Sequence, residues 1–381
     1  MVYYSRLLDL TGESRQRSFF LFGPRQTGKT WLLKKTFPNV PFYNLLLADV
    51  FLRVSQRPSM IREELLARGK FPQPVIIDEI QKLPLLLDEV QYLIEEYGYR
   101  FILTGSSSRK LKRGGGNLLG GRARTKYLFP LVSQEIPNYD LIRILNFGSI
   151  ASIYNSLQPE GDLESYVGNY LKEEIQAEGL VRRIENFSRF LQVASLANAE
   201  LVNFANIASD AGVPARTVEE YFLILQDTLV GALVEPFTKT KKRKAITTAK
   251  FYFFDVGVCN TLAGRKEIKP KTELFGKVLE HFIFTELRAY LHYRNDQRPL
   301  SFWRSKSGYE VDFLLGDETA IEVKASEQVS ERHCTGLKAL AEDIHLKKKV
   351  VVSMDSAPRK LQDIEVLPIK IFLQRLWEDG I

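Results

Sequence analysis

The sequence predicts an α/β protein whose N-terminal part folds as a mostly parallel β-sheet covered by helices. Three observations lead to this fold class. An apolar run at residues 19–22 ends in a glycine-containing loop, and a second apolar run at residues 75–77 ends in two acidic residues. Through residues 1–135, short apolar runs alternate with amphipathic helical patterns. This alternation is typical of βαβ units and therefore of a parallel sheet.

The loop after the first apolar run, GPRQTGKT, matches the phosphate-binding pattern GxxxxGK[ST] in full. Its two glycines let the backbone curl until successive N–H groups point into one concavity, and a helix beginning near Lys29 directs its positive end there. Lys29 adds a charge near the β- and γ-phosphates, and the Thr30 hydroxyl is a ligand for Mg²⁺. The predicted phosphate-binding residues are Gly23, Pro24, Arg25, Gln26, Thr27, Gly28, Lys29 and Thr30.

The second apolar run ends in Asp78 and Glu79, the Walker B pattern. Acids at the carboxyl end of a buried parallel strand lie where open α/β sheets bind their ligands. We expect Asp78 to hold Mg²⁺, through water or Thr30, and Glu79 to polarise the attacking water. The cofactors predicted at this edge of the sheet are therefore ATP and Mg²⁺.

A further strand, predicted at residues 100–103, precedes a polar segment that could contact the γ-phosphate. Ser106 is the first candidate, with Thr104 and Ser107 as rivals. The alternative is that these hydroxyls only cap the next helix.

A glycine-rich basic segment covers residues 113–126, and a fifth strand is predicted at residues 127–132. Arg122 or Arg124 could act as an arginine finger on the ATP of a neighbouring subunit, which would imply a homo-oligomer. The alternative is a solvated basic loop. The other elements predicted in this part are a strand at residues 42–46, a helical and amphipathic stretch at residues 51–70 and a helix from Pro84 to a stop at Gly98.

Composition limits the class of protein. A chain of 381 residues is too long for one ordinary domain, and 45% hydrophobic and 26% charged residues describe a soluble globular protein. We expect no membrane-spanning segment, because no apolar run approaches 18 residues. The start of the chain lacks a signal-peptide pattern, and two cysteines exclude a disulfide framework, so we expect a cytoplasmic protein. The net charge of +7 permits a nucleic-acid partner.

In the middle of the chain, residues 136–190 are predicted to be helical. They could form a lid or a linker. Residues 200–230 predict a helix-turn-helix, and the basic run KTKKRK at residues 239–244 could form the wing of a winged helix. Glu219 and Glu220 near the start of the second helix would repel a DNA backbone, so we favour a structural or protein-contact role over base reading.

The last third predicts a helix at residues 274–291 and a β-hairpin closed near Gly316. Asp312 lies on the first strand of this hairpin, and Glu322 and Lys324 share one face of the return strand. Two carboxylates can hold a divalent metal ion, and a lysine can orient water or stabilise the transition state. Glu280 on the preceding helix would complete the set. The alternative is an ordinary solvated Glu-x-Lys pair.

The four histidines have no metal-ligand spacing, so we predict structural or surface roles for His281, His292, His333 and His345.

Together these motifs resemble a large prokaryotic family of AAA-type ATPases, in which a P-loop domain is joined to a C-terminal domain of the PD-(D/E)xK nuclease superfamily. The matching segments span essentially the whole chain: GPRQTGKT, VIIDEIQKLP, ILTGSSSRKL, GGRARTKYLFPLVSQEI, KFYFFDVGVCNTLAG, EVDFLL and IEVKAS. The resemblance implies that Arg122 is the finger and that Asp312, Glu322 and Lys324 are the nuclease core. A sensor-2 arginine, which the family pattern would place in a helical lid, is not evident.

The resemblance implies a P-loop ATPase domain at residues 1–150, a helical linker with a winged helix at 151–245, and an α/β restriction-endonuclease-like domain at 246–381. The function expected is Mg²⁺-dependent ATP hydrolysis coupled to a nuclease-like domain that acts on or near DNA. One alternative is an ATP-gated DNA- or protein-binding assembly module whose C-terminal sheet is catalytically silent. Another is a DNA-binding regulator that acts through the winged helix.

Overall fold

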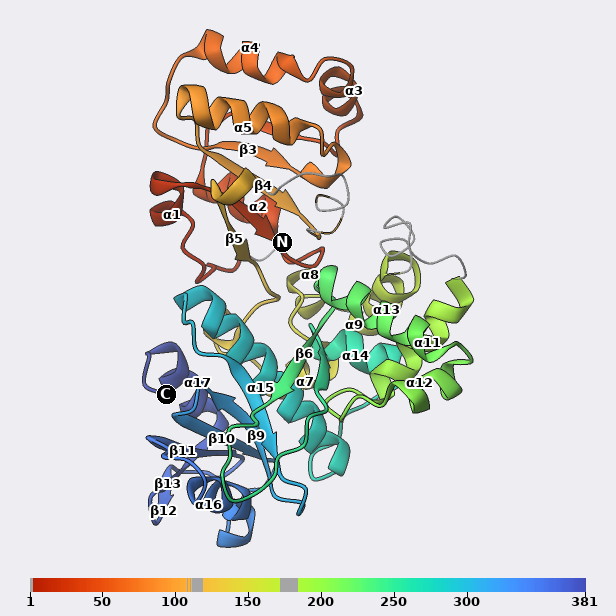
Figure 1. The fold of residues 1–381 in the computed structure, drawn as a ribbon, viewed down its shortest axis with the longest axis vertical. Helices are drawn as coiled ribbons and strands as arrows, with labels where there is room; N and C mark the ends of the chain where they lie inside the picture. Colours follow the sequence, from red (N-terminus) through yellow and green to blue (C-terminus); the bar gives the residue numbers. More distant parts are fainter. Residues whose placement is uncertain (1–2, 108, 110, 112–118, 172–183) are drawn as a thin grey trace. The chain divides into compact units, whose positions relative to one another are not determined.

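The computed structural model describes residues 3–107, 109, 111, 119–171 and 184–381 (Figure 1). Its chain forms two compact units. The nucleotide-binding unit contains Tyr3–Pro130 with the short segment Asp227–Val230, and the C-terminal unit contains Leu131–Gln226 with Gly231–Ile381. The three domains expected from the sequence stay a prediction. The expected boundary near residue 245 falls between two strands that pair with each other, which is why both sides of it belong to one unit.

The nucleotide-binding unit is built on a five-stranded sheet with the order β2-β3-β4-β1-β5 (Figure 1). Every pairing in it is parallel, as expected. β1 and β3, which precede the two predicted phosphate-site motifs, are buried along their whole length. The strands are β1 (Ser18–Phe22), β2 (Phe42–Asn44), β3 (Val75–Asp78), β4 (Phe101–Gly105) and β5 (Ala123–Tyr127).

Helices and short 3₁₀ turns cover this sheet. Their bounds are α1 (Thr11–Gln16), α2 (Lys29–Thr36), α3 (Ala48–Gln56), α4 (Ser59–Arg68), η1 (Ile80–Lys82), α5 (Leu86–Tyr97) and η2 (Leu119–Gly121). Residues 51–70, predicted to be helical, are divided between the separate helices α3 and α4. Pro58 lacks an N–H and disfavours helical geometry at Arg57, which has φ −142° and ψ 82°.

The predicted position of the fifth strand, residues 127–132, is wrong. β5 lies at Ala123–Tyr127, whereas residues 127–132 were expected. Its polar sequence pairs in parallel with β1, from Ser18 opposite Ala123 to Phe22 opposite Tyr127. An edge strand needs only one partner and buries little, so its sequence lacks the apolar pattern on which the prediction depended.

The first part of the C-terminal unit is helical, which confirms the prediction for the described part of residues 136–190. Its elements are η3 (Ser133–Glu135), α7 (Leu141–Phe147), α8 (Ala151–Tyr154), α9 (Pro159–Ser165), the π-helical turn η4 (Tyr166–Leu171) and α11 (Ile184–Leu196). The predicted helix-turn-helix follows as α12 (Phe204–Ala211) and α13 (Ala215–Asp227). Gly212, with φ +66°, ends α12 and starts the turn.

An eight-stranded mixed sheet forms the rest of the C-terminal unit, in the order β12-β13-β11-β10-β9-β8-β6-β7. Its strands are β6 (Gly231–Pro236), β7 (Lys250–Phe253), β8 (Leu300–Arg304), β9 (Glu310–Leu315), β10 (Thr319–Lys324), β11 (Lys348–Ser353), β12 (Arg359–Leu361) and β13 (Ile364–Pro368). Its helical elements are α14 (Val256–Leu262), α15 (Glu273–Arg294), η5 (Glu331–Cys334), α16 (Thr335–Ala341) and α17 (Ile369–Trp377).

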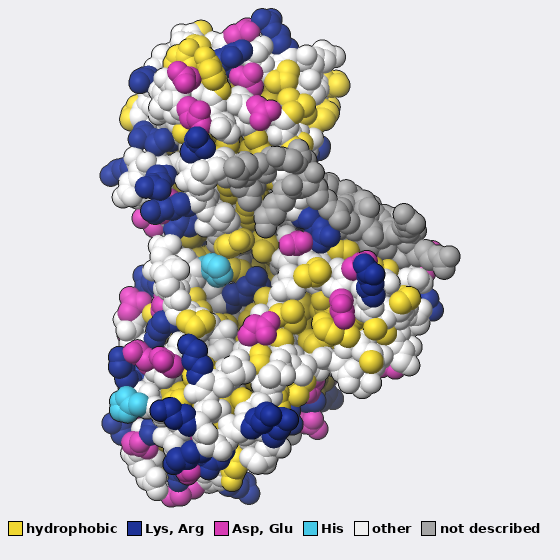
Figure 2. Space-filling view, viewed as in Figure 1, with side chains coloured by type: hydrophobic (Ala, Val, Ile, Leu, Met, Phe, Trp, Pro, Cys, Tyr) yellow, Lys and Arg dark blue, Asp and Glu magenta, His cyan; other side chains and the backbone are white. Residues whose placement is uncertain are grey.

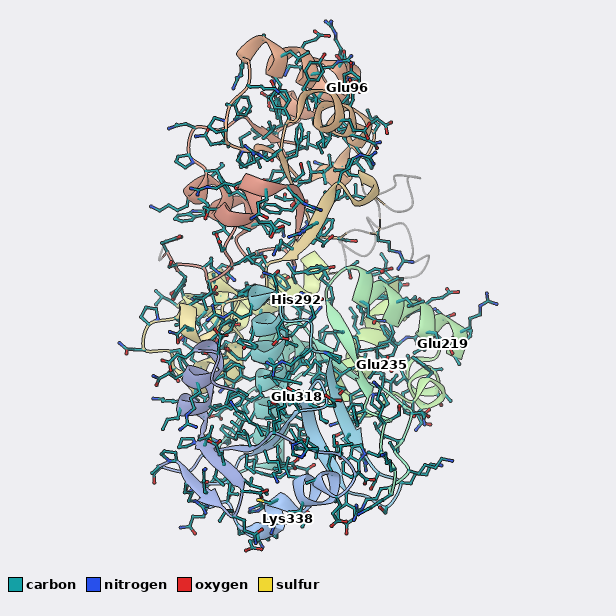
Figure 3. All side chains as sticks on the ribbon, turned by 60° about the vertical axis from the view of Figure 1, so that its left-hand side comes forward. Glu96, Glu219, Glu235, His292, Glu318 and Lys338 are labelled. Carbon is teal, nitrogen blue, oxygen red and sulfur yellow. The ribbon has the colours of Figure 1, made fainter. Side chains whose placement is uncertain are left out.

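The predicted hairpin is confirmed. β9 and β10 pair in antiparallel fashion from Leu315 opposite Thr319 to Phe313 opposite Ile321, and Gly316, with φ +65°, lies in the turn between them. In Figure 3 the label Glu318 marks this turn and His292 marks the far end of α15. The basic run at residues 239–244, predicted as a possible wing, lies between the paired strands β6 and β7, and β6 also pairs with β8 in the eight-stranded sheet.

Candidate functional site

The P-loop encloses the side chain of Lys29. This lysine is only 6% exposed, and its Nζ donates to the carbonyl oxygens of Gly23 at 2.7 Å and Pro24 at 3.0 Å. The ammonium group therefore lies within the loop, where bound phosphate oxygens would replace the backbone carbonyls as its partners.

Both glycines of the loop are required for different reasons. Gly28 has φ +91°, which a residue with a side chain rarely adopts. At Gly23 the reason is space, since a Cβ atom would lie 2.3 Å from the carbonyl oxygen of Leu128. The loop can thus curl only with glycine at these two positions.

Asp78 lies next to the P-loop threonine, as predicted. The Thr30 hydroxyl donates to Asp78 Oδ2 at 2.8 Å, and the Thr104 hydroxyl donates to Asp78 Oδ1. The strand order explains both contacts, because β4, which carries Thr104, lies between β1 and β3. Hydroxyl and carboxylate oxygens are the donors that Mg²⁺ prefers, so Thr30 and Asp78 fit a magnesium site.

Glu79 is held in a left-handed backbone conformation, with φ +63° and ψ +46°. Its N–H donates to the Thr104 hydroxyl at 3.0 Å, and its carboxylate accepts from Gln81 Nε2 at 2.5 Å. The same Gln81 nitrogen donates to the Ser106 hydroxyl at 3.3 Å. The predicted water-polarising residue and the first-choice γ-phosphate contact are therefore joined through one amide.

Gln81 is a site residue that the motif analysis missed. It is buried, and among the described residues its Oε1 has no hydrogen-bond partner. A 3₁₀ turn directly after the strand brings residues two apart together, and no spacing rule signals this. The available signal was a polar residue between the apolar Ile80 and Leu83.

The three rival hydroxyls after β4 have separate partners. Thr104 binds Asp78 and Glu79, Ser106 contacts Gln81, and Ser107 Oγ accepts from the Arg109 N–H at 3.0 Å. The helix-cap alternative thus applies to Ser107, while Ser106 remains the candidate that lies beside Glu79.

Both candidate finger arginines pair with carboxylates of their own unit. Arg122 Nε lies 2.5 Å from Glu95 Oε1, and Arg124 donates to Glu13 at 2.9 Å. Part of the basic segment before them, residues 112–118, lies outside the described residues. A role of Arg122 on a neighbouring subunit stays a prediction.

In the C-terminal unit four acids form a group that we call the carboxylate cluster: Glu280, Glu310, Asp312 and Glu322. Continuing the β9–β10 register places Asp312 opposite Glu322. Asp312 Oδ2 accepts from the Val323 N–H at 2.7 Å, and Lys324 Nζ lies 2.5 Å from Glu322 Oε1. The Asp…Glu-x-Lys arrangement expected from the sequence is therefore assembled on one face of the hairpin.

Glu280 lies in this cluster but has partners that the sequence analysis did not anticipate. Lys250 Nζ lies 3.1 Å from Glu280 Oε1 and 2.7 Å from Glu310 Oε1. The Tyr252 hydroxyl also donates to Glu280, at 2.6 Å. Among the described residues no group of three or more His, Cys, Asp and Glu side chains could hold a metal ion. Glu280 is thus a partner of a lysine and a tyrosine in this structure.

The electrostatics of the cluster follow from its burial. Burial raises the pKa of Glu280 to about 7, with the nearby Asp312 adding to the effect and Lys250 opposing it. Burial and Asp312 hold the pKa of Glu322 well above its usual range. Burial alone would lower the pKa of Lys250, but Glu280, Asp312 and Glu310 outweigh it and raise that pKa. Carboxylates packed this closely favour a bound cation or proton.

One observation supports a fit between this cluster and a divalent cation. Glu322 Oε2 is buried, and within the described part of the chain it has no hydrogen-bond partner. An unpaired buried carboxylate oxygen is costly, and Asp312 lies beside it. Asp312 and Glu322 therefore fit a hard cation, with Lys324 at its edge, whereas Glu280 and Glu310 are already paired.

The histidine prediction holds for His281, which is buried and contacts the Phe253 carbonyl oxygen through Nε2 at 2.7 Å. Burial lowers its pKa to about 4, so its ring is neutral near pH 7. His333 Nδ1 accepts from the Ser330 N–H at 3.0 Å and so caps a turn.

Three family models match successive parts of the chain. Residues 15–137 match an AAA domain, residues 138–269 match a domain of unknown function (DUF8612), and residues 275–372 match another domain of unknown function (DUF4143). The relatives include an uncharacterised protein of Methanocaldococcus jannaschii, 21% identical, with 82% of this chain and 75% of that protein covered. No helix among the described residues is long and apolar enough to span a membrane.

The chain also has similarity to solved structures. The Aeropyrum pernix ORC1 protein in complex with DNA is 12% identical, with 65% of this chain and 86% of that one covered and a TM-score of 0.25. A STAND protein with a tetratricopeptide repeat sensor from Pyrococcus horikoshii is 16% identical, with coverages of 74% and 46% and a TM-score of 0.22. The AAA-domain match over residues 15–137 agrees with the P-loop geometry in that part of the chain.

Proposed function

We propose that this protein hydrolyses ATP in a Mg²⁺-dependent reaction at the P-loop and that hydrolysis is coupled to a nuclease-like C-terminal unit acting on or near DNA. The observation that carries the first part is the contact between Thr30 and Asp78 at 2.8 Å, beside the enclosed Lys29. This contact brings the P-loop and the acidic end of β3 together, as a site for a triphosphate and its Mg²⁺ requires.

Each residue of the site has a role that its position supports. Lys29 and the backbone N–H groups of residues 23–30 bind the phosphates, and Thr30 with Asp78 would hold Mg²⁺, which neutralises charge on the β- and γ-phosphates when bound. Glu79 orients and polarises the attacking water, Gln81 positions Glu79, and Ser106 contacts the γ-phosphate. Arg122 is proposed to act on the ATP of a neighbouring copy in a homo-oligomer.

Steady-state ATPase assays on Lys29→Ala test this proposal. We expect the rate to fall by at least two orders of magnitude, because the phosphate-binding ammonium is lost. The matched control is Lys70→Ala, an exposed lysine of the same unit, which should hydrolyse ATP at the normal rate. Normal hydrolysis by Lys29→Ala would overturn the ATPase proposal.

The nuclease part is supported by the unpaired Glu322 oxygen beside Asp312 and Lys324. Plasmid and single-stranded DNA incubated with Mg²⁺ or Mn²⁺, with and without ATP, should be cut by the protein and left intact by Asp312→Asn. Asp317→Asn, in the turn of the same hairpin and exposed, serves as the control. Equal cutting by wild type and Asp312→Asn would show that the activity does not arise from this site.

A second candidate is an ATP-gated binding or assembly module with a silent C-terminal sheet. The pairing of Glu280 and Glu310 with Lys250 favours it, because those two carboxylates are engaged by the chain itself. Absence of cleavage on every substrate, with ATP hydrolysis intact, would support this candidate.

A regulator that reads DNA through the winged helix has less support. The backbone N–H groups of Lys241, Lys242 and Arg243 all donate to Asp343 Oδ1, and the Arg243 guanidinium pairs with Asp343 and Glu342. Glu219 on α13, labelled in Figure 3, is exposed. On the face in Figure 2, Lys and Arg side chains are interspersed with Asp and Glu. A phosphate backbone would meet acids as well as cations.

A further inference from the structure

The segment KFYFFDVG, residues 250–257, carries β7 into α14, and none of the functions described so far uses its side chains. Alternate side chains of a strand share a face, so Lys250 and Tyr252 point one way and Phe251 and Phe253 the other. The phenylalanines pack in the core, where Phe251 meets Phe222 with ring centroids 4.8 Å apart. The polar pair reaches the carboxylate cluster.

Lys250 bridges two carboxylates that come from different elements. Its ammonium lies 3.1 Å from Glu280 on α15 and 2.7 Å from Glu310 on β9, and its side chain is only 4% exposed. The Tyr252 hydroxyl adds a hydrogen bond to the same oxygen of Glu280. One buried cation shared by two carboxylates is the arrangement that a metal ion would otherwise adopt.

The formal charges of the cluster give the net charge that remains after its carboxylates have been paired with the cations of the chain. Its four carboxylates, when ionised, carry −4, and Lys250, Lys324 and Arg304, whose Nη1 lies 3.6 Å from Glu310 Oε2, contribute +3, which leaves −1. The cluster therefore keeps a net negative charge, and the unpaired oxygen that could receive a cation belongs to Glu322. A second divalent ion would have to displace the ammonium group.

We propose that Lys250 is a built-in second cation of the carboxylate cluster, so that the cluster takes one divalent metal ion at Asp312 and Glu322 and excludes a second from Glu280 and Glu310. This inference rests on the proposed function in taking Asp312 and Glu322 as the metal pair. It does not require that DNA is cut. Lys250 is thus a positioning residue, which keeps Glu280 and Glu310 away from the metal.

The test counts Mn²⁺ ions bound without nucleotide, by electron paramagnetic resonance of the free ion, in the full chain with Thr30→Ala and Asp78→Asn to remove the P-loop metal site. We expect one ion in this background and two after Lys250→Met, which removes the cation that Glu280 and Glu310 share. Lys250→Met with Glu310→Gln restores the formal charge of −1 and should bind one ion again. Lys306→Met, an exposed lysine after β8, is the matched control and should also bind one.

Two ions in the background protein, or none, would overturn the proposal, and so would one ion in a folded Lys250→Met variant. Circular dichroism establishes whether each variant is folded. If Lys250→Met does not fold, Lys250→Gln, which also removes the ammonium group, replaces it in the count. The count is independent of cleavage, so one bound ion in a protein that cuts no DNA would refute the nuclease proposal and leave this inference standing.

Discussion

At the residue scale, Glu79 has an unfavourable left-handed backbone conformation in a buried site. A residue with a side chain in the left-handed region costs about 1–2 kcal/mol. At Glu79 the Thr104 hydroxyl accepts from the backbone N–H and Gln81 donates to the carboxylate. These bonds stabilise the conformation and hold the carboxylate near Ser106, so Thr104 and Gln81 determine where the Glu79 carboxylate points.

The first prediction concerns Gln81. Replacing it with alanine removes the amide that joins Glu79 and Ser106, so we expect kcat for ATP hydrolysis to fall at least about tenfold, with little change in nucleotide affinity. Stopped-flow nucleotide binding and steady-state hydrolysis separate the two effects. Gln91→Ala, a half-buried glutamine on α5 whose amide donates to Glu95, is the control. A variant with weakened nucleotide binding and normal kcat would contradict a role in positioning Glu79.

Glu286 is a second buried acid, outside both sites. Its carboxylate accepts from the Ser133 N–H at 2.6 Å, the Ser133 hydroxyl at 3.0 Å and Trp377 Nε1 at 2.8 Å. It therefore joins the segment after residue 130 to α17 within the C-terminal unit. Burial is the main cause that raises its pKa to about 7, from 4.5.

This pKa predicts how stability depends on pH. Between pH 4.5 and 7 the folded state binds the proton and the unfolded state releases it, so the free energy of unfolding falls as pH rises. The loss is on the order of 3 kcal/mol. In urea unfolding of the C-terminal unit, the free energy of unfolding of wild type, measured relative to that of Glu286→Gln, should fall by this amount from pH 4.5 to 7. Glu273→Gln, exposed on the same helix, should show no such trend.

At the scale of elements, the P-loop depends on the segment that follows β5. Leu128 donates its N–H to Phe22 at 2.8 Å, which places its own carbonyl against Gly23. The edge strand thus fixes the chain that closes one side of the loop. This is a reason for Gly23 that the phosphate-binding pattern alone does not supply.

The third prediction follows from that close approach. In Gly23→Ala the new methyl group would lie 2.3 Å from a backbone oxygen that cannot rotate away. We expect a loss of at least about 1–3 kcal/mol in the stability of the nucleotide-binding unit and weakened ATP binding. Gly161→Ala, where a Cβ meets nothing within 4 Å, should be neutral or slightly stabilising. Thermal unfolding of both variants makes the comparison, and equal stabilities would refute the steric explanation.

At the scale of the whole molecule, two compact units carry two chemically different sites. The P-loop site belongs entirely to Tyr3–Pro130, and the carboxylate cluster belongs entirely to the C-terminal unit. Each unit has its own sheet and its own apolar core. A ligand of one site should therefore stabilise its own unit first.

The fourth prediction uses this separation. We expect calorimetry to resolve two unfolding transitions, of which only that of the nucleotide-binding unit rises with a slowly hydrolysed ATP analogue and Mg²⁺. At a hundredfold excess over Kd the stabilisation is about 2.7 kcal/mol. Lys29→Ala should abolish the shift. An equal shift of both transitions, or a single cooperative one, would show that the units unfold as one body.

The sequence by itself determined the features that depend on neighbouring residues. The P-loop, the strand ending in Asp78 and Glu79, the helix-turn-helix and the hairpin that aligns Asp312 with Glu322 were all predicted from local spacing. Backbone geometry and side-chain periodicity act over a few residues, so a pattern of that length is enough to specify them.

Only the tertiary structure decided which distant residues meet. The contact of Thr104 with Asp78 depends on β4 lying between β1 and β3, and the pairing of Lys250 with Glu280 depends on helix α15 packing near β7. The position of the polar edge strand β5 likewise depends on its pairing with β1. Strand order and helix packing are set by burial of the whole core, which no local pattern encodes.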